Sequence, residues 1–198
     1  HVECRHTEVR FPLSKHHPES ICNLVYTIYT RGSLLSKATG GVFSASEKLV
    51  DTLKAESFSN NDEAIRVVCG TGSHELVGLK FEGGEVVFDG FPGNGEDEEI
   101  KAWKELCQAM NKASIKQHHI QAKKVDETNE KFAFRTWLTR LGMNGPELKA
   151  ERQILYRNLS GRTAFRTTAD EEKWKTRQAK KRQELREKKE EEASAEEG

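Results

Sequence analysis

The chain of 198 residues lacks several patterns that would narrow its function at once. It has only 4 cysteines, Cys4, Cys22, Cys69 and Cys107, and none of them forms a C-x-x-C pair. Cysteines that are widely spaced and lie mostly in apolar runs are typical of reduced core residues, not of a disulfide framework. No apolar run approaches the roughly 18 residues that cross a bilayer, and no signal-peptide pattern opens the chain. We therefore expect a cytoplasmic protein that does not bind membranes.

Metal-binding patterns are also missing. Two groups of residues suggest a metal site. The first consists of Cys4, His6 and the pair His16-His17, and the second is the pair His118-His119. Neither group has a usual zinc-ligand spacing, and adjacent histidines point to different faces of a helix or a strand. The sequence therefore predicts no metal.

Catalytic and phosphate-loop motifs are missing as well. The glycine-bearing segments GTGSHE and GGVFSAS, which start at Gly70 and Gly40, do not complete the P-loop motif and are expected to be turns. No pair of carboxylates is placed by its spacing, and no base can be assigned to a cysteine nucleophile. We expect a protein that is not an enzyme and that needs no cofactor.

The charges balance over the whole chain but not along it. Residues 41–100 contain 4 Lys or Arg and 13 Asp or Glu, whereas residues 131–189 contain 17 and 7. An acidic middle and a basic end indicate two surfaces with different partners, or two surfaces that attract each other. Solvated faces that merely differ in charge are the simplest alternative.

Residues 1–92 predict a small α+β module. Apolar spacings of three and four predict a helix from Pro18 to near Gly32, and Ser44 or Ser46 is expected to cap the next helix. Alternation and β-branched content predict strands over residues 8–13, 64–69, 76–81 and 85–88, the last two joined in a hairpin by Gly83-Gly84. The expected architecture is a small antiparallel or mixed sheet with helices on one face.

Residues 96–168 predict a helical module that follows a boundary at GFPGNG, residues 90–95. A first helix begins at the acidic run 96–99 and extends toward Ile120. Residues 126–166 then predict two helices at a corner. Thr128 is expected to cap the first, Gly142 to end it, and Pro146 to begin a second that reaches about Leu159.

Residues 169–198 are nearly all charged or polar. Such a segment forms either a solvated helix or a disordered tail, and a helix near Trp174 that frays into the acidic end is favoured.

The basic end predicts a phosphate-binding surface. Arginine and lysine that stand on exposed helix faces suit recognition of a nucleic-acid backbone, and Trp174 could stack on a base. The alternatives are that the arginines pair with glutamates of the same chain, or that they bind an acidic protein. The candidate nucleic-acid-binding residues are Arg135, Arg140, Lys149, Arg152, Arg157, Arg162, Arg166, Lys173, Lys175 and Arg177.

One long run, KFAFRTWLTRLGMNGPELKAERQILYRNLSGRTAFR, also resembles a known family, together with FPLSKHHPESICNLVYTIYTRGSLLSKATGG and FDGFP upstream. The chain is similar, from Val9 to Arg166, to an uncharacterised family labelled "virulence-related protein". Its members are encoded on prophages and conjugative elements of Gram-positive gut bacteria. The resemblance implies a mobile-element setting, and it also implies residues ahead of His1 that this chain lacks. It carries no catalytic or ligand residues.

Two functions follow from the charges and this setting. The first is a non-enzymatic accessory protein of a phage or mobile element that binds DNA or RNA through the basic helical module. The alternative is an anti-CRISPR-like inhibitor of a host defence nuclease, which would act by protein binding through its acidic middle surface.

Overall fold

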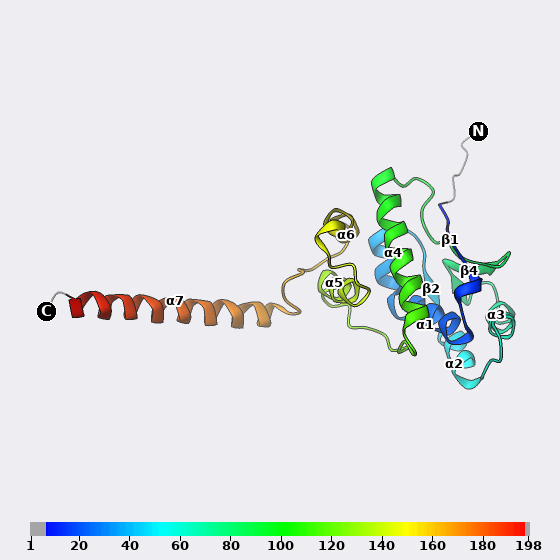
Figure 1. Cartoon of the computed structure of the whole chain (residues 1–198), viewed down its shortest axis with the longest axis horizontal. Coiled ribbons are helices and arrows are strands. Elements are labelled where there is room, and N and C mark those ends of the chain that lie inside the picture. The colour runs from blue at the N-terminus through cyan, green and yellow to red at the C-terminus, as the bar shows by residue number, and fades with distance from the viewer. Residues whose placement is uncertain (1–6, 197–198) are drawn as a thin grey trace.

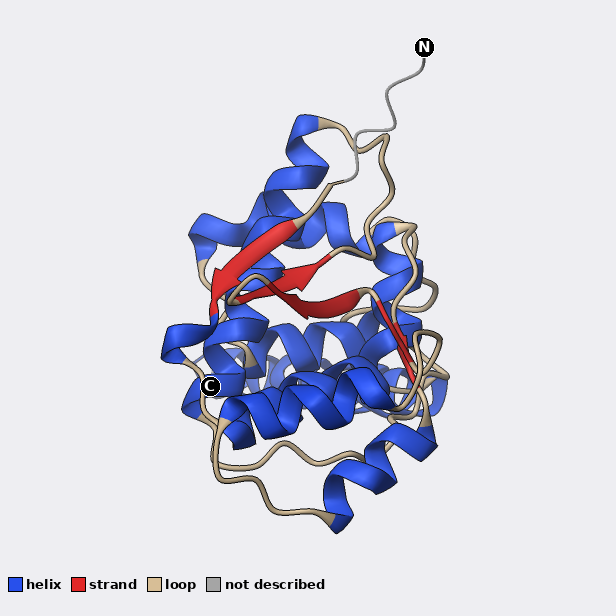
Figure 2. Cartoon of the chain, turned by 90° about the vertical axis from the view of Figure 1, so that its right-hand side faces the viewer, coloured by secondary structure: helices blue, strands red, loops and turns tan. Residues whose placement is uncertain are grey.

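The computed structural model describes residues 7–196 as an α+β protein in which helices predominate, and this confirms the predicted class. The strands form a small sheet against a largely helical molecule (Figure 2). The elements in chain order are β1 (Val9–Pro12), the 3-10 helix η1 (Leu13–Lys15), α1 (Pro18–Thr39), β2 (Ser44–Ala45), α2 (Glu47–Ala55), α3 (Asn61–Gly70), β3 (Leu76–Val77), β4 (Leu79–Glu82), β5 (Glu85–Phe88), α4 (Asp97–Lys116), α5 (Glu130–Arg140), the 3-10 helix η2 (Pro146–Leu148), α6 (Lys149–Tyr156) and α7 (Thr168–Glu196).

The main sheet is antiparallel with strand order β1-β5-β4. Because side chains alternate along a strand, the register places six apolar residues on one face, and these are Val9, Phe11, Leu79, Phe81, Val86 and Phe88. Arg10 and Lys80 lie on the other face, where they form ion pairs with Glu8 and Glu82. One face is therefore packed on the core, and the other carries charged side chains.

The predicted hairpin is present, but its first strand is shorter than expected. Gly83 and Gly84 join β4 to β5 with φ angles of 58° and 72°, which glycine adopts without strain. Residues 76–81 do not form one strand. Leu76 and Val77 pair instead with Ala45 and Ser44 of β2 in a separate two-stranded sheet.

The strand predicted over residues 64–69 is wrong, because these residues belong to helix α3. Asn60 caps this helix, and its side-chain oxygen accepts a hydrogen bond from the backbone N–H of Glu63 over 3.0 Å. Ala64 and Val68 then face the core at a helical spacing of four. The cap and this buried face outweigh the strand preference of the β-branched residues.

Helix α1 is longer than predicted. It begins where Pro18 takes the first helical position, but it continues through Gly32 and ends at Thr39, followed by the C-cap residue Gly40 with a φ of 74°. Gly32 is needed for packing, because a Cβ there would lie 2.6 Å from the carbonyl oxygen of Phe43. Ser46 caps the next helix, α2, as one of the two predicted candidates.

Helices α1 and α4 pack side by side at the centre of the body (Figure 1). A single hydrophobic core joins both predicted modules, since it includes Leu24 of α1 and Phe88 of β5 as well as Trp103 of α4. The predicted boundary at residues 90–95 therefore does not separate two cores.

The helical corner has the predicted order with different boundaries. Asn129, not Thr128, caps α5, because the backbone N–H and hydroxyl of Thr128 both bond to Asp126. Gly142 follows α5 with a φ of 82°, as expected of a helix stop. The second helix is shorter than predicted: a 3-10 turn at Pro146–Leu148 leads into α6, which ends at Tyr156. Upstream, α4 ends at Lys116, before Ile120.

Helix α7 projects from the rest of the molecule, and the sheet lies at the opposite end (Figure 1). Its exposed side chains include Trp174 and Leu185, and the ring of Trp174 packs on Phe165 with 5.6 Å between ring centroids. The charged segment is therefore a helix, as favoured, but it does not fray at the acidic end, because α7 continues to Glu196.

Two predictions concern membranes and metals. Between residues 7 and 196, no helix is both long and apolar enough to span a bilayer. The same range holds no group of three or more His, Cys, Asp or Glu arranged to bind a metal ion. Cys4 and His6 lie outside the described residues.

Candidate nucleic-acid interface

Asn129 positions the segment that follows α6 against α5. Its side-chain oxygen caps α5 and also accepts a hydrogen bond from the backbone N–H of Arg162 over 3.0 Å. Its amide nitrogen donates to the backbone oxygen of Phe165 over 2.6 Å. A carboxylate oxygen of Glu130 accepts a further bond from the backbone N–H of Ser160 over 2.8 Å. Residues 160–166 are thereby fixed beside the first turns of α5.

A depression of about 490 Å³ lies between α5, α6 and this segment. Lys131 and Arg135 come from α5, Lys149 and Arg152 from α6, and Arg162 from the segment itself. No carboxylate is among the described residues that line it. We call these five residues the basic depression.

Backbone carbonyls hold two of these guanidinium groups in place. Nη1 of Arg135 donates to the carbonyl oxygen of Thr163 over 3.1 Å. Nη1 of Arg152 donates to the carbonyl oxygens of Met143 and Gly145, over 2.8 and 2.6 Å. A guanidinium carries five N–H donors, so each arginine keeps donors for a ligand after making these bonds. The site is therefore partly organised before a ligand binds.

Arg162 forms an ion pair with an acidic residue. Within residues 7–196, the other four members of the basic depression form no ion pair with a carboxylate. The partner of Arg162 is Glu171 in the first turn of α7, a residue that also accepts from Nζ of Lys175 over 2.9 Å. The hydrogen bond from Lys175, together with the positive charge of Arg162, lowers the pKa of the Glu171 carboxyl. These contacts connect the start of α7 to the depression.

Four of the ten predicted residues lie together in the basic depression, and these are Arg135, Lys149, Arg152 and Arg162. They come from three different segments of the chain. The hydrogen bonds of Asn129 bring the last of these segments against the first.

The other six predicted residues lie elsewhere. Arg157 approaches Glu99 of α4 at 3.9 Å, and Arg166 pairs with Asp126 at 3.4 Å. Arg140 lines a different pocket. The remaining three stand on α7, and these are Lys173, Lys175 and Arg177. Six of the ten side chains therefore lie outside the basic depression, and one of these six, Arg166, lines a neighbouring pocket together with Arg162.

Sequence reasoning missed Lys131. Lys131 lies one helical turn before Arg135, so their spacing of four on α5 is a usable signal.

The acidic middle of the chain is partly neutralised. On the charged face of the sheet, Arg10 lies between Glu8, Glu82 and Glu85, with N to O distances of 2.6, 3.1 and 3.6 Å. The hydrogen bond from Arg10 lowers the pKa of the Glu8 carboxyl. The acids at the start of α4 face its positive end. These acids are therefore engaged within the chain.

Comparison with protein-family models, curated proteins and solved structures found no match to this chain. The resemblance to the "virulence-related protein" family stays a prediction. The function is therefore proposed from the geometry of the site.

Proposed function

We propose that the chain binds nucleic acid through the basic depression, as a non-enzymatic accessory protein of a phage or conjugative element. One observation carries this proposal: five cationic side chains from three segments surround one depression, and no carboxylate is among the described residues that line it. Cations grouped in this way attract a phosphate backbone, because binding releases the counterions that surround it.

The depression favours contacts to phosphates over contacts to bases. Tyr156, the aromatic residue among its described lining residues, is only 7% exposed and packs edge-on against Phe134. A ring that is covered in this way offers no face on which a base can stack. Binding should therefore depend little on sequence and strongly on salt.

The test is fluorescence anisotropy with labelled duplex DNA, single-stranded DNA and RNA, all with 5′-hydroxyl ends, at rising salt. The test variant combines Lys131→Gln, Arg135→Gln and Lys149→Gln. The matched control combines Lys48→Gln, Lys54→Gln and Lys104→Gln, which removes the same charge from exposed lysines on α2 and α4.

The test variant should weaken binding at low salt, and its salt dependence should be less steep by about one unit of slope for each phosphate interaction that the substitutions remove. The control should bind like the wild type. Absence of binding at about 50 mM salt, or an equal reduction of affinity in both variants, would contradict the proposal.

A further inference from the structure

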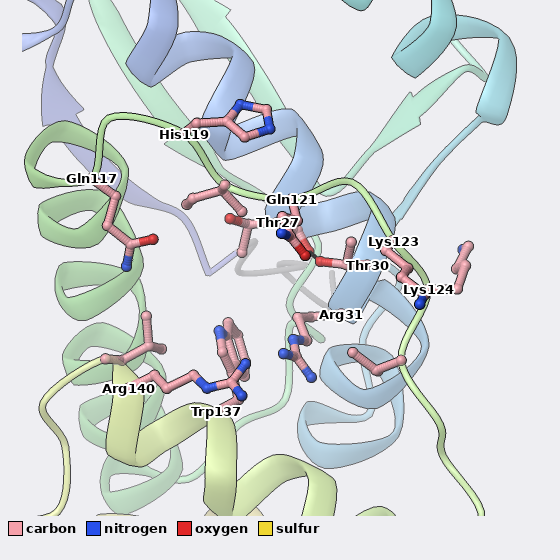
Figure 3. Close-up of a pocket in the computed structure, with 13 residues that line it drawn as sticks. Thr27, Thr30, Arg31, Gln117, His119, Gln121, Lys123, Lys124, Trp137 and Arg140 are labelled. Atoms are coloured by element: carbon pink, nitrogen blue, oxygen red, sulfur yellow. Dashed lines mark hydrogen bonds between the residues drawn. The ribbon is translucent and has the colours of Figure 1, made fainter.

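A second basic site lies on another face of α5. It is a pocket of about 350 Å³ between α1, α5 and the segment that follows α4. Arg31, Trp137 and Arg140 lie close together in it (Figure 3). We call it the Arg31 pocket.

Arg31 is held in a position that is unfavourable for a cation. Its guanidinium carbon lies 5.6 Å from the ring centroid of Trp137, within cation-π range. Burial, and then the nearby charge of Arg140, lower the pKa of Arg31 to about 10, and the charge of Glu127 opposes this shift more weakly. Within residues 7–196, neither arginine forms an ion pair with a carboxylate. Two like charges thus face one pocket without a paired acid.

The remaining lining residues suit an anion that also carries hydrogen-bonding groups. Lys123 adds positive charge, and Gln117 and Gln121 bring side-chain amides to the pocket (Figure 3). Lys124 also lines the pocket, with its Nζ 4.2 Å from the centroid of the Tyr29 ring. No described residue that lines the pocket is acidic. The volume of the pocket also falls within the range of small-ligand sites, which begins at about 300 Å³.

We propose that the Arg31 pocket binds a terminal phosphate monoester, carried either by a free nucleotide or by the 5′ end of a nucleic-acid strand. A monoester carries close to two negative charges at neutral pH, which matches the two guanidinium groups. The guanidinium fork also suits the geometry of phosphate oxygens. This proposal rests on the pocket alone and does not require binding at the basic depression.

The experiment compares two sources of the same group. Isothermal titration calorimetry measures binding of the four ribonucleoside monophosphates, with the unphosphorylated nucleosides as blanks. Anisotropy compares one short oligonucleotide with a 5′-phosphate and with a 5′-hydroxyl. The variants are Arg31→Gln and Arg140→Gln, and the matched control is Arg66→Gln, which removes the same charge from an exposed arginine on α3, away from both basic sites.

The wild type should bind a phosphorylated probe, and Arg31→Gln and Arg140→Gln should each weaken this binding by about 10- to 100-fold. Arg66→Gln should leave it unchanged. Arg31→Gln should retain or raise the melting temperature, since it removes an unpaired, partly buried charge. If the nucleoside monophosphates bind more tightly than the nucleosides, the ligand is a nucleotide. If the 5′-phosphorylated strand binds more tightly than the 5′-hydroxyl strand, the ligand is a strand end. Both results support the proposal.

The proposal is overturned if no phosphorylated probe binds, or if Arg31→Gln and Arg66→Gln bind it equally. Failure here is distinct from failure of the proposed function, because that function is tested with 5′-hydroxyl strands and with variants of the depression.

Discussion

The side-chain oxygen of Asn23 accepts a hydrogen bond from the backbone N–H of Ile120 over 2.9 Å. The same side chain donates through its amide nitrogen to the carbonyl oxygens of Ser114 and Gln117, over 3.1 and 3.0 Å. Asn23 is only 1% exposed, so these bonds have little competition from water. They fasten the end of α4 to α1 and place the segment that lines the Arg31 pocket.

Asn23→Ala should therefore lower the free energy of unfolding by about 2–4 kcal/mol, because it leaves buried backbone groups without partners. Urea denaturation measures the change. Asn144→Ala is the control, since Asn144 is exposed and should change stability by less than about 0.5 kcal/mol. Equal effects of the two substitutions would show that the bonds of Asn23 contribute little.

His16 should make stability depend on pH near neutrality. Burial lowers the pKa of this imidazole, and its Nε2 lies 2.8 Å from the side-chain oxygen of Asn111. As the pH falls, the unfolded chain takes up a proton at His16 near about pH 6.5, before the folded chain does. The stability from this residue is therefore complete above about pH 6.5 and declines as the pH falls toward the lower, folded pKa.

Melting curves between about pH 5 and pH 8 check this prediction. His16→Gln should show a smaller fall in stability across that range than the wild type, while His74→Gln, at an exposed histidine, should keep the wild-type slope. A His16→Gln profile parallel to that of the wild type would contradict it.

Removal of residues 180–198 should leave the body folded. Beyond Trp174, the described side chains of α7 are exposed or only partly covered, so the truncation removes little buried surface. The melting temperature should stay within about 2 °C of the wild-type value. The comparison is removal of residues 168–198. This larger truncation should lower the melting temperature further, because it also deletes Glu171 and uncovers Phe165.

Cysteine reactivity should separate Cys69 from the two buried cysteines. Cys69 is exposed, whereas Cys22 and Cys107 are buried. Burial raises the pKa of the Cys22 thiol to about 11 and that of Cys107 well above its usual range, so both stay protonated at about pH 8. Iodoacetamide should alkylate Cys69 before Cys22 and Cys107 in the native protein, as peptide mass mapping over time would show. In urea, Cys22, Cys69 and Cys107 should react at similar rates. If they also react at similar rates in the native protein, the prediction is wrong.

Local signals predicted much of the fold. Gly83-Gly84 marks the hairpin, Pro18 marks the start of α1, and Gly142 marks the end of α5. The strand predicted over residues 64–69 is wrong because β-branched content alone does not reveal the cap at Asn60. A single capping residue changes the preferred structure of the residues after it, and composition does not show this.

The sites were less predictable because they depend on distant segments. Arg31 and Trp137 are far apart in the sequence, and the fold alone brings them together. The basic depression likewise requires residues 160–166 to fold back onto α5, which the bonds of Asn129 achieve. The sequence indicates the sign of the charge near α5, but it does not indicate how the cations are divided between two sites.

Helix α5 is a wall shared by both of these sites. Lys131 and Arg135 line the basic depression, while Trp137 and Arg140 line the Arg31 pocket. A ligand that displaces this helix from one side also moves residues that line the other. Thermodynamic reciprocity then requires that each ligand alter the affinity for the other by the same factor.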